Sequence, residues 1–292
     1  MKELRRILIG HDGSQASNAA IRDLKGAGLP ERMSATILTA VDTLIPPAAK
    51  AFGISGLSLK QLREVSAISI KRGRNSAETA AQALKAIFPR WTIRTEVREA
   101  SPTQALIEKA RSWNADLIAV GAHGHSHLGR FMGSVSQLVL TQAPCSVRVG
   151  RRRINKGRDA KILVAVDGSA GSERALEAVA GRTWPTNSQI AVISVLRPYE
   201  IALRNEKRYQ VREAAGRVLE HFADRFREKL PKVSFRIAIG DPKFLISQEA
   251  AAWGADCIFV GARSLSSARR LWLGGVSMAI AARASCSVEV VR

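Results

Sequence analysis

Two stretches of this sequence carry residue types that can hold an anionic ligand. Asp12-Gly13-Ser14 follows an apolar run, and a glycine-rich stretch extends from Gly121 to Val135. Glycines let a backbone approach an anion closely, and a helix that begins at Ser134 would present unpaired N–H groups to it. These features together predict a phosphate-type site, although Asp-Gly-Ser after a strand can also serve only as a turn or a helix cap.

Three histidines, His123, His125 and His127, alternate within the glycine-rich stretch. Three histidines can bind zinc. In an extended segment, however, alternating side chains point to opposite sides, so all three would rarely converge on one ion. We interpret them as polar residues lining an anion site, with zinc as the alternative, and expect no metal site.

The elements that must position these stretches are predicted by alternating apolar and helical patterns. Leu117–Val120 and Cys257–Val260 are uninterrupted apolar runs, as expected of central parallel strands covered on both faces. Strands that alternate with helices indicate a layered α/β fold, in which ligands bind beyond the carboxyl ends of the strands where strand order reverses. The first half has predicted strands at 5–11, 35–42, 92–98, 116–121 and 145–149 and predicted helices at 17–27, 60–88, 102–113 and 134–142; the second half has predicted strands at 161–166, 189–195, 233–239, 256–261 and 286–291.

The chain also repeats itself once, because several segments recur in the same order at similar spacing. Asp12-Gly13-Ser14 returns as Asp167-Gly168-Ser169, Trp113-Asn114-Ala115-Asp116 as Trp253-Gly254-Ala255-Asp256, and Cys145-Ser146-Val147 as Cys286-Ser287-Val288. A period of this length indicates duplication of a whole domain. We predict two tandem doubly wound parallel-sheet domains, 1–150 and 160–292, joined by a basic linker at 151–159, and a long loop at 43–59.

Together these motifs resemble the universal stress protein family. Its signature, Gly-x2-Gly-x9-Gly-Ser/Thr followed by Val-Ser and a Pro-Cys-x-Val strand, is similar to the stretch from Gly121 to Val147. The resemblance covers nearly all of the chain, once per repeat. It implies a Rossmann-like fold and a regulatory role in the stress response that depends on binding an adenine nucleotide. ATP is the expected ligand, and Mg²⁺ could accompany it.

The resemblance also implies roles for particular residues. In nucleotide-binding members, an aspartate after the first strand and a backbone group near the end of the second strand hold the adenine and ribose, while the glycines and a helix N-terminus hold the phosphates. Carried onto this sequence, these roles fall on Asp12, Val41, Gly121, Gly124, Gly133, Ser134 and Val135, with His123 beside them, and in the second repeat on Asp167, Gly261 and Gly274.

Departures from the family pattern make the two sites unequal. Only eight residues separate Gly124 from Gly133, one fewer than the pattern. In the second repeat Ser264 replaces the second glycine, and Gly275 replaces the hydroxyl residue, which removes a donor. Arg263, Arg269 and Arg270 still keep that loop basic. We therefore expect the better-kept site in the first repeat and a weaker or empty one in the second.

Other functions remain as alternatives. The chain has no GxxxxGK[ST], HExxH or GxSxG motif, so at most slow ATP hydrolysis or phosphotransfer near Ser134 is expected. The net charge of +20 suits a binder of nucleic acid or another polyanion, but aromatic residues make up only 5% of the chain and no nucleic-acid-binding motif is present. A stress scaffold that binds no nucleotide is a further alternative.

Cysteine usage and apolar run length favour a cytoplasmic location. The three cysteines form no CxxC pair and lie in or beside apolar runs, which predicts buried, reduced thiols. No apolar run approaches the ~18 residues of a membrane helix, and no signal-peptide core is present. Because the family's last strand pairs across a two-fold in dimers, the two repeats could satisfy that pairing within one chain. We expect such a pseudo-dimer, and a homodimer of the whole chain.

Overall fold

The computed structural model describes residues 4–41, 59–122, 132–151, 159–197, 233–262 and 274–292, together with the single positions 213, 216 and 220, and gives only the backbone for 59–63. Residues 43–58 of the predicted loop at 43–59 and most of the predicted linker at 151–159 lie outside the described residues, and Leu59, the last residue of that predicted loop, begins a helix instead.

Each repeat contributes five strands to one sheet. The first repeat supplies β1 (Arg6–Gly10), β2 (Ser34–Val41), β3 (Thr92–Glu99), β4 (Leu117–Gly121) and β5 (Ser146–Gly150). The second supplies β6 (Lys161–Val166), β7 (Gln189–Leu196), β8 (Val233–Ile239), β9 (Cys257–Gly261) and β10 (Ser287–Val291).

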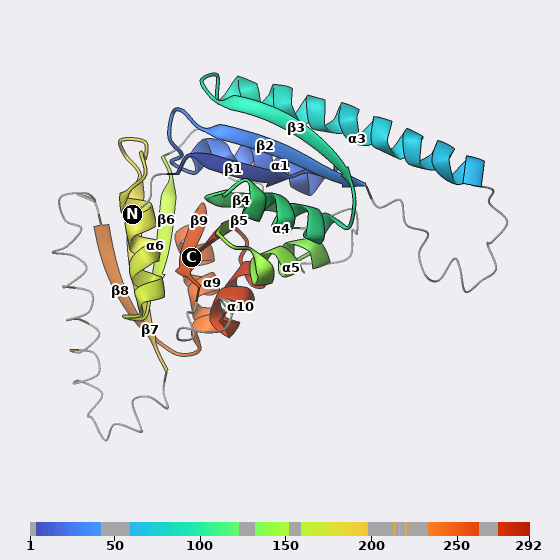
Figure 1. The fold of residues 1–292 in the computed structure, drawn as a ribbon. Helices are drawn as coiled ribbons and strands as arrows, with labels where there is room; N and C mark the ends of the chain where they lie inside the picture. The colour runs from blue at the N-terminus through green and yellow to red at the C-terminus, as the bar shows by residue number, and fades with distance from the viewer. Residues whose placement is uncertain are drawn as a thin grey trace, which may run out of the picture.

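The ten described strands are ordered β3-β2-β1-β4-β5-β10-β9-β6-β7-β8 (Figure 1). All neighbours within a repeat are parallel, and β5 and β10 join the two repeats in antiparallel pairing. In each repeat the strand order reverses at the first strand, between β1 and β4 or between β6 and β9. The predicted fold class, two tandem doubly wound parallel-sheet domains, is therefore confirmed.

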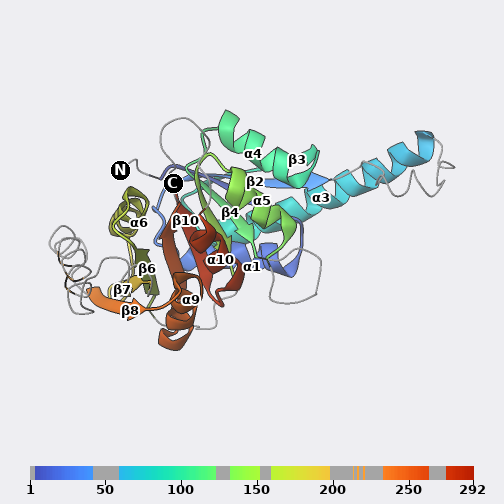
Figure 2. The same cartoon turned by 90° about the horizontal axis from the view of Figure 1, so that it is seen from below.

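Helices cover both faces of the sheet (Figure 2). The described helices of the first repeat are α1 (Gln15–Asp23), η1 (Leu24–Gly26), α3 (Leu59–Ile87), α4 (Pro102–Ser112) and α5 (Ser134–Gln142). Those of the second are α6 (Ala170–Ala180), α9 (Pro242–Trp253) and α10 (Gly275–Arg283). None of these described helices combines the length and apolar character needed to cross a membrane.

Local chemistry explains where several elements begin. Ser14 caps α1, since the Ser17 N–H donates to Ser14 Oγ at 3.1 Å, so this helix starts two residues before the predicted 17–27 and closes in a 3₁₀ turn. Pro102 occupies the first turn of α4, where its fixed φ and missing N–H suit a helix start, but the hydroxyl of Ser101 makes no capping bond. Asp241 does cap α9, because its carboxylate accepts from the Lys243 N–H at 2.9 Å.

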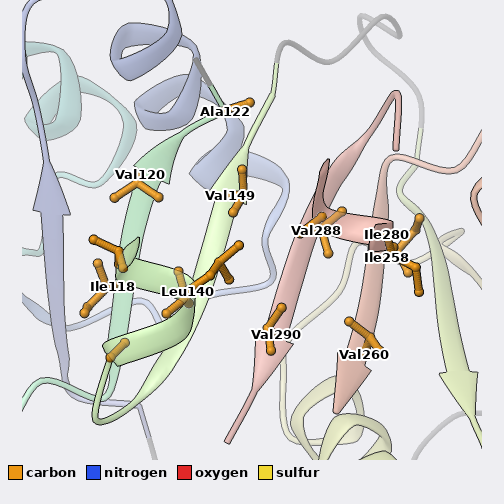
Figure 3. Close-up of a cluster of buried hydrophobic side chains, with 14 of the residues drawn as sticks. Ile118, Val120, Ala122, Leu140, Val149, Ile258, Val260, Ile280, Val288 and Val290 are labelled. Atoms are coloured by element: carbon orange, nitrogen blue, oxygen red, sulfur yellow. The ribbon is translucent and has the colours of Figure 1, made fainter. Parts of the chain in front are cut away.

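The largest apolar cluster is shared by the two repeats (Figure 3). Val149 of β5 and Val288 of β10 point into it from the two central strands, together with Leu140 of α5 and Ile280 of α10. Two smaller clusters lie on the opposite face, one in each repeat. Burial of apolar surface is the main favourable term in folding, so the two repeats stabilise each other through this shared core.

The cysteines are free thiols, of which Cys257 and Cys286 are buried and Cys145 is partly exposed. Cys145 and Cys286 lie one residue before β5 and β10, rather than inside these strands as predicted. Trp113 and Trp253, which recur at the same place in the two repeats, lie at the ends of α4 and α9.

Candidate functional site

A cavity of about 290 Å³ lies at the carboxyl ends of the strands in the first repeat, where the strand order reverses. It is bounded by the ends of β1, β2 and β4 and by the first turns of α4 and α5. Its lining combines apolar side chains from these elements with polar groups from the turns, namely Gly10, His11, Asp12, Ser14, Ser17, Leu38, Ala40, Pro102, Leu106, Val120, Gly121, Gly133, Ser134, Val135 and Ser136.

Asp12 is exposed at the edge of this cavity and also has a local structural role. Its Oδ1 accepts from the Ser14 N–H at 3.0 Å, which closes the turn that leads into α1. Asp167 makes the same turn in the second repeat, where the Ser169 N–H donates to it at 3.1 Å. The turn and the ligand roles are compatible, because a carboxylate has further lone pairs that can face the cavity.

The N-terminus of α5 supplies donors to the cavity. Gly133 occupies the N-cap position and has no side chain with which to cap the helix, so the first-turn N–H groups of Ser134, Val135 and Ser136 have no intrahelical partner. The hydroxyl of Ser136 donates to the Gly121 carbonyl at 2.6 Å, and the Gly133 N–H donates to the Ala122 carbonyl at 2.8 Å. These bonds fix the helix start against the end of β4, so its positive end faces the cavity.

Gly121 itself is required by packing. A Cβ at this position would lie 2.6 Å from the carbonyl carbon of Ala16, in the first turn of α1. Gly261 stands in the same relation to α6, with a Cβ placed 2.2 Å from the carbonyl carbon of Gly171. The recurrence of glycine at the ends of β4 and β9 therefore has a steric reason that holds with or without a ligand.

The end of β2 forms the apolar wall of the cavity. Leu38 and Ala40 line it, together with Leu106 from α4. Val41 does not line the cavity, and its side chain packs near Gly73 of α3, where an added Cβ would lie 3.1 Å from Val41 Cγ2. The role predicted for Val41 concerned a backbone group, and it stays a prediction.

His11 is a buried residue of the cavity to which the sequence reasoning assigned no role. Its Nε2 lies 3.3 Å from Asn18 Oδ1 of α1, and its Nδ1 lies 3.4 Å from Ser76 Oγ of α3. Burial lowers the pKa of His11 below its ordinary value of 6.5, against the opposing effects of Asn18 and Asp12. Comparison of the two repeats could have drawn attention to His11, because Val166 occupies the equivalent position in the second repeat.

A second cavity, of about 430 Å³, occupies the same place in the second repeat. Asp167, Gly261 and Gly274 line it, and their predicted role in binding a nucleotide stays a prediction. Ser277 Oγ donates to the Gly261 carbonyl at 2.8 Å, which repeats the tie between helix and strand seen at Ser136. This cavity also contains Lys243, whose Cε would lie 3.8 Å from a Cβ at Gly275.

Several predicted residues lie outside the described part of the chain. They are His123, Gly124, His125, His127, Arg263, Ser264, Arg269 and Arg270. Within the residues that are described, no three histidine, cysteine or acidic side chains are grouped so as to hold a metal ion.

Comparison with known proteins identifies the class that this fold and these cavities define. The model of the universal stress protein family matches residues 3–151 and again 160–292. The chain therefore belongs to the universal stress protein family, with two copies of its domain in tandem.

Individual relatives agree with this assignment. A universal stress protein of Mycolicibacterium smegmatis is 28% identical over 220 residues, which cover 69% of this chain and 69% of that protein. Universal stress protein YxiE of Bacillus subtilis is 27% identical over 145 residues, covering 45% of this chain and 98% of that protein. The crystal structure of a universal stress protein from Archaeoglobus fulgidus has the same fold, with a TM-score of 0.67, 22% identity and 98% coverage of each chain.

Proposed function

We propose that this protein is an adenine-nucleotide-binding regulator of the stress response, with ATP as its ligand in the cavity of the first repeat. The observation that carries the proposal is the pairing of Asp12 with the uncapped N-terminus of α5 across one cavity. A nucleotide has an apolar base, a hydroxylated ribose and an anionic tail, and this cavity offers a matching group for each part.

The fit can be followed along the cavity. Leu38, Ala40 and Leu106 give an apolar wall suited to adenine. The Asp12 carboxylate is an acceptor for ribose hydroxyls, and the N–H groups at the start of α5 suit phosphates. The volume of about 290 Å³ is near the lower end of the ~300–1,000 Å³ range typical of ligand pockets. Mg²⁺ would accompany the phosphates as a counter-ion.

We further propose that the first repeat binds the nucleotide more tightly than the second. The sequence differences support this preference, because Ser134 offers a hydroxyl where the second repeat has Gly275, and Gly124 is replaced by Ser264. The second cavity keeps Asp167 and adds Lys243, so it retains some capacity for anions. The proposed activity is binding, with at most slow hydrolysis.

The pairing of β5 with β10 supports a pseudo-dimer of the two repeats within one chain. Since these two strands pair with each other, a further homodimer would use a different surface. The free, buried thiols of Cys257 and Cys286 support a reducing compartment, which we propose is the cytoplasm.

The test is a calorimetric titration of ATP into nucleotide-free full-length protein, beside the matched variants Asp12→Asn and Asp167→Asn. Asparagine keeps the side-chain oxygen that closes each turn but removes the charge. We expect about one ATP per chain, and a ten- to hundredfold loss of affinity in Asp12→Asn, the size of about 1.5–3 kcal/mol for a hydrogen bond to a charged group. Asp167→Asn should bind as the wild type does.

Two controls separate this proposal from its alternatives. Binding that persists at physiological salt, with no retention of DNA, excludes a general polyanion effect of the +20 charge. Loss of binding in Asp167→Asn alone would place the working site in the second repeat. Absence of binding heat in the wild type would contradict the proposal and favour a scaffold.

A further inference from the structure

The antiparallel pairing of β5 and β10 is centred on one pair of residues. The register sets Arg148 opposite Glu289, with valine opposite valine on either side. The recurring segments Cys145–Val149 and Cys286–Val290 give Arg148 and Glu289 the same place in their repeats. An approximate two-fold axis therefore passes between them, and a pairing of two like repeats would set each of these residues against its own copy.

Part of the interface is the same when viewed from either repeat. The Arg151 N–H donates to Ser287 Oγ at 2.9 Å, and the Arg292 N–H donates to Ser146 Oγ at 3.2 Å. The guanidinium of Arg151 donates to carbonyl oxygens around the end of α10, and that of Arg292 to carbonyl oxygens around the end of α5. Such reciprocal contacts would form equally well between like repeats, so they hold the strands together without selecting a partner.

Four buried charges break this symmetry. Arg148 Nε lies 2.6 Å from an Asp23 oxygen and Arg148 Nη1 lies 3.1 Å from Glu289 Oε2, while Arg182 pairs with the other Glu289 oxygen. All four side chains are at most 3% exposed. Two first repeats would oppose guanidinium to guanidinium here, and two second repeats carboxylate to carboxylate. Each central charge would keep the partner from its own repeat, Asp23 for Arg148 and Arg182 for Glu289, but would face a like charge across the axis. Such a contact is destabilising at a buried site, where opposite charges must compensate each other.

The shape of the interface adds an independent restriction. The Thr183 N–H donates to the Gly28 carbonyl at 3.2 Å, and these two residues lie equally far from the Asp-Gly-Ser turns of their repeats. Gly28 has a φ of +63°, and a Cβ there would lie 3.0 Å from the ring of Trp184. If two second repeats paired, Thr183 of one would take the position of Gly28 beside Trp184 of the other. The positive φ and the close approach of the ring at that position favour glycine over threonine.

We infer that this surface selects its partner, so that a first repeat pairs with a second repeat in preference to another first repeat. The partner is recognised by complementary buried charge at Arg148 and Glu289 and by the fit of Gly28 against Trp184. The inference concerns the pairing of repeats and does not depend on whether either cavity binds a nucleotide.

The test uses charge reversal in the full chain, with Arg148→Glu and Glu289→Arg as separate variants. In either variant both central strands carry the same charge, so neither internal closure nor pairing of identical chains is favoured. A mixture contains the unmodified Arg148 of one chain and the unmodified Glu289 of the other, which can pair between chains. Sedimentation velocity should show each variant alone as an opened monomer, and the equimolar mixture as a heterodimer.

The inference is overturned if either variant alone remains a closed monomer with the wild-type melting temperature, or forms homodimers as readily as the mixture forms heterodimers. Arg151→Gln is the matched control from the symmetric part of the interface. It should lower the melting temperature but form no heterodimer with Arg148→Glu. Heterodimers in this control would mean that general loosening, and not charge, governs pairing.

A milder cycle keeps the inference testable if the reversed chains do not fold. Arg148→Met, Glu289→Gln and the double variant are compared by melting temperature. The double variant should lose less than the sum of the two single losses, because either single change already breaks the contact. Strictly additive losses would show that the two residues are not coupled and would overturn the inference.

Discussion

Replacement of Gly121 by alanine tests the close approach between β4 and α1 on which the cavity is built. The added Cβ would lie 2.6 Å from the Ala16 carbonyl carbon and 2.8 Å from the Ser17 nitrogen. The first distance is roughly 0.8 Å short of the 3.4 Å at which ordinary van der Waals contact begins. Both atoms belong to backbone, and Ser14 fixes the start of α1, so a rotamer change cannot relieve the overlap.

The expected loss follows from two opposing terms. Overpacking of a core position typically costs about 1–3 kcal/mol, and an overlap with backbone belongs at the upper end. Alanine restricts the unfolded chain, which returns about 0.4–1 kcal/mol. We therefore expect Gly121→Ala to lower the free energy of unfolding by about 2 kcal/mol. Urea unfolding followed by circular dichroism should show this loss as a lower transition midpoint.

Gly275→Ala is the matched control, because the nearest atom to its added Cβ is Lys243 Cε at 3.8 Å. Its stability should remain within about 0.5 kcal/mol of the wild type. If Gly121→Ala is equally stable, the steric reasoning is wrong. If that variant is stable but no longer binds ATP, Gly121 serves the approach of a ligand and not the packing of α1.

Three further predictions concern pH, capping and thiol chemistry. Because burial lowers the pKa of His11 below 6.5, His11 binds a proton more tightly in the unfolded chain than in the folded one. The stability of the wild type should therefore fall as the pH drops through 6.5 toward the folded pKa, and the stability of His11→Gln should fall less. Parallel pH profiles of the two proteins would contradict this prediction. Ser14→Ala should lower the free energy of unfolding by about 1 kcal/mol, measured in urea, because α1 loses its cap. Ser169→Ala should cost the same in the second repeat, where the Ser172 N–H donates to Ser169 Oγ at 3.3 Å. No change in either variant would show that the caps are dispensable. Burial raises the pKa of Cys286 to about 12 and raises that of Cys257 further above its ordinary value. Iodoacetamide at neutral pH should therefore modify both thiols only after unfolding. Rapid modification of either thiol in the native protein, located by peptide mass analysis, would refute their burial.

Much of the fold could be predicted from the sequence because its signals are local. Apolar runs such as Leu117–Val120 become central strands, and the recurrence of Asp-Gly-Ser reveals the duplication. The same signals brought Asp12 together with Gly133, Ser134 and Val135, since topology alone sets the end of β1 beside the end of β4.

What escaped prediction depends on contacts between distant segments. The histidine at position 11 is interpretable only once Asn18 and Ser76 are seen beside its ring. Arg148 and Glu289 each look like a misplaced charge in a buried strand until the antiparallel pairing sets one against the other. A direct comparison of the two repeats, position by position, was the signal that could have pointed to both.

The most direct test of the central claim is a crystal structure of the full chain grown with ATP. We predict electron density for adenosine between Leu38 and Leu106, with the ribose near Asp12 and the phosphates at the first turn of α5. Density for the nucleotide in the second cavity alone, or on the protein surface with the first cavity empty, would contradict the account.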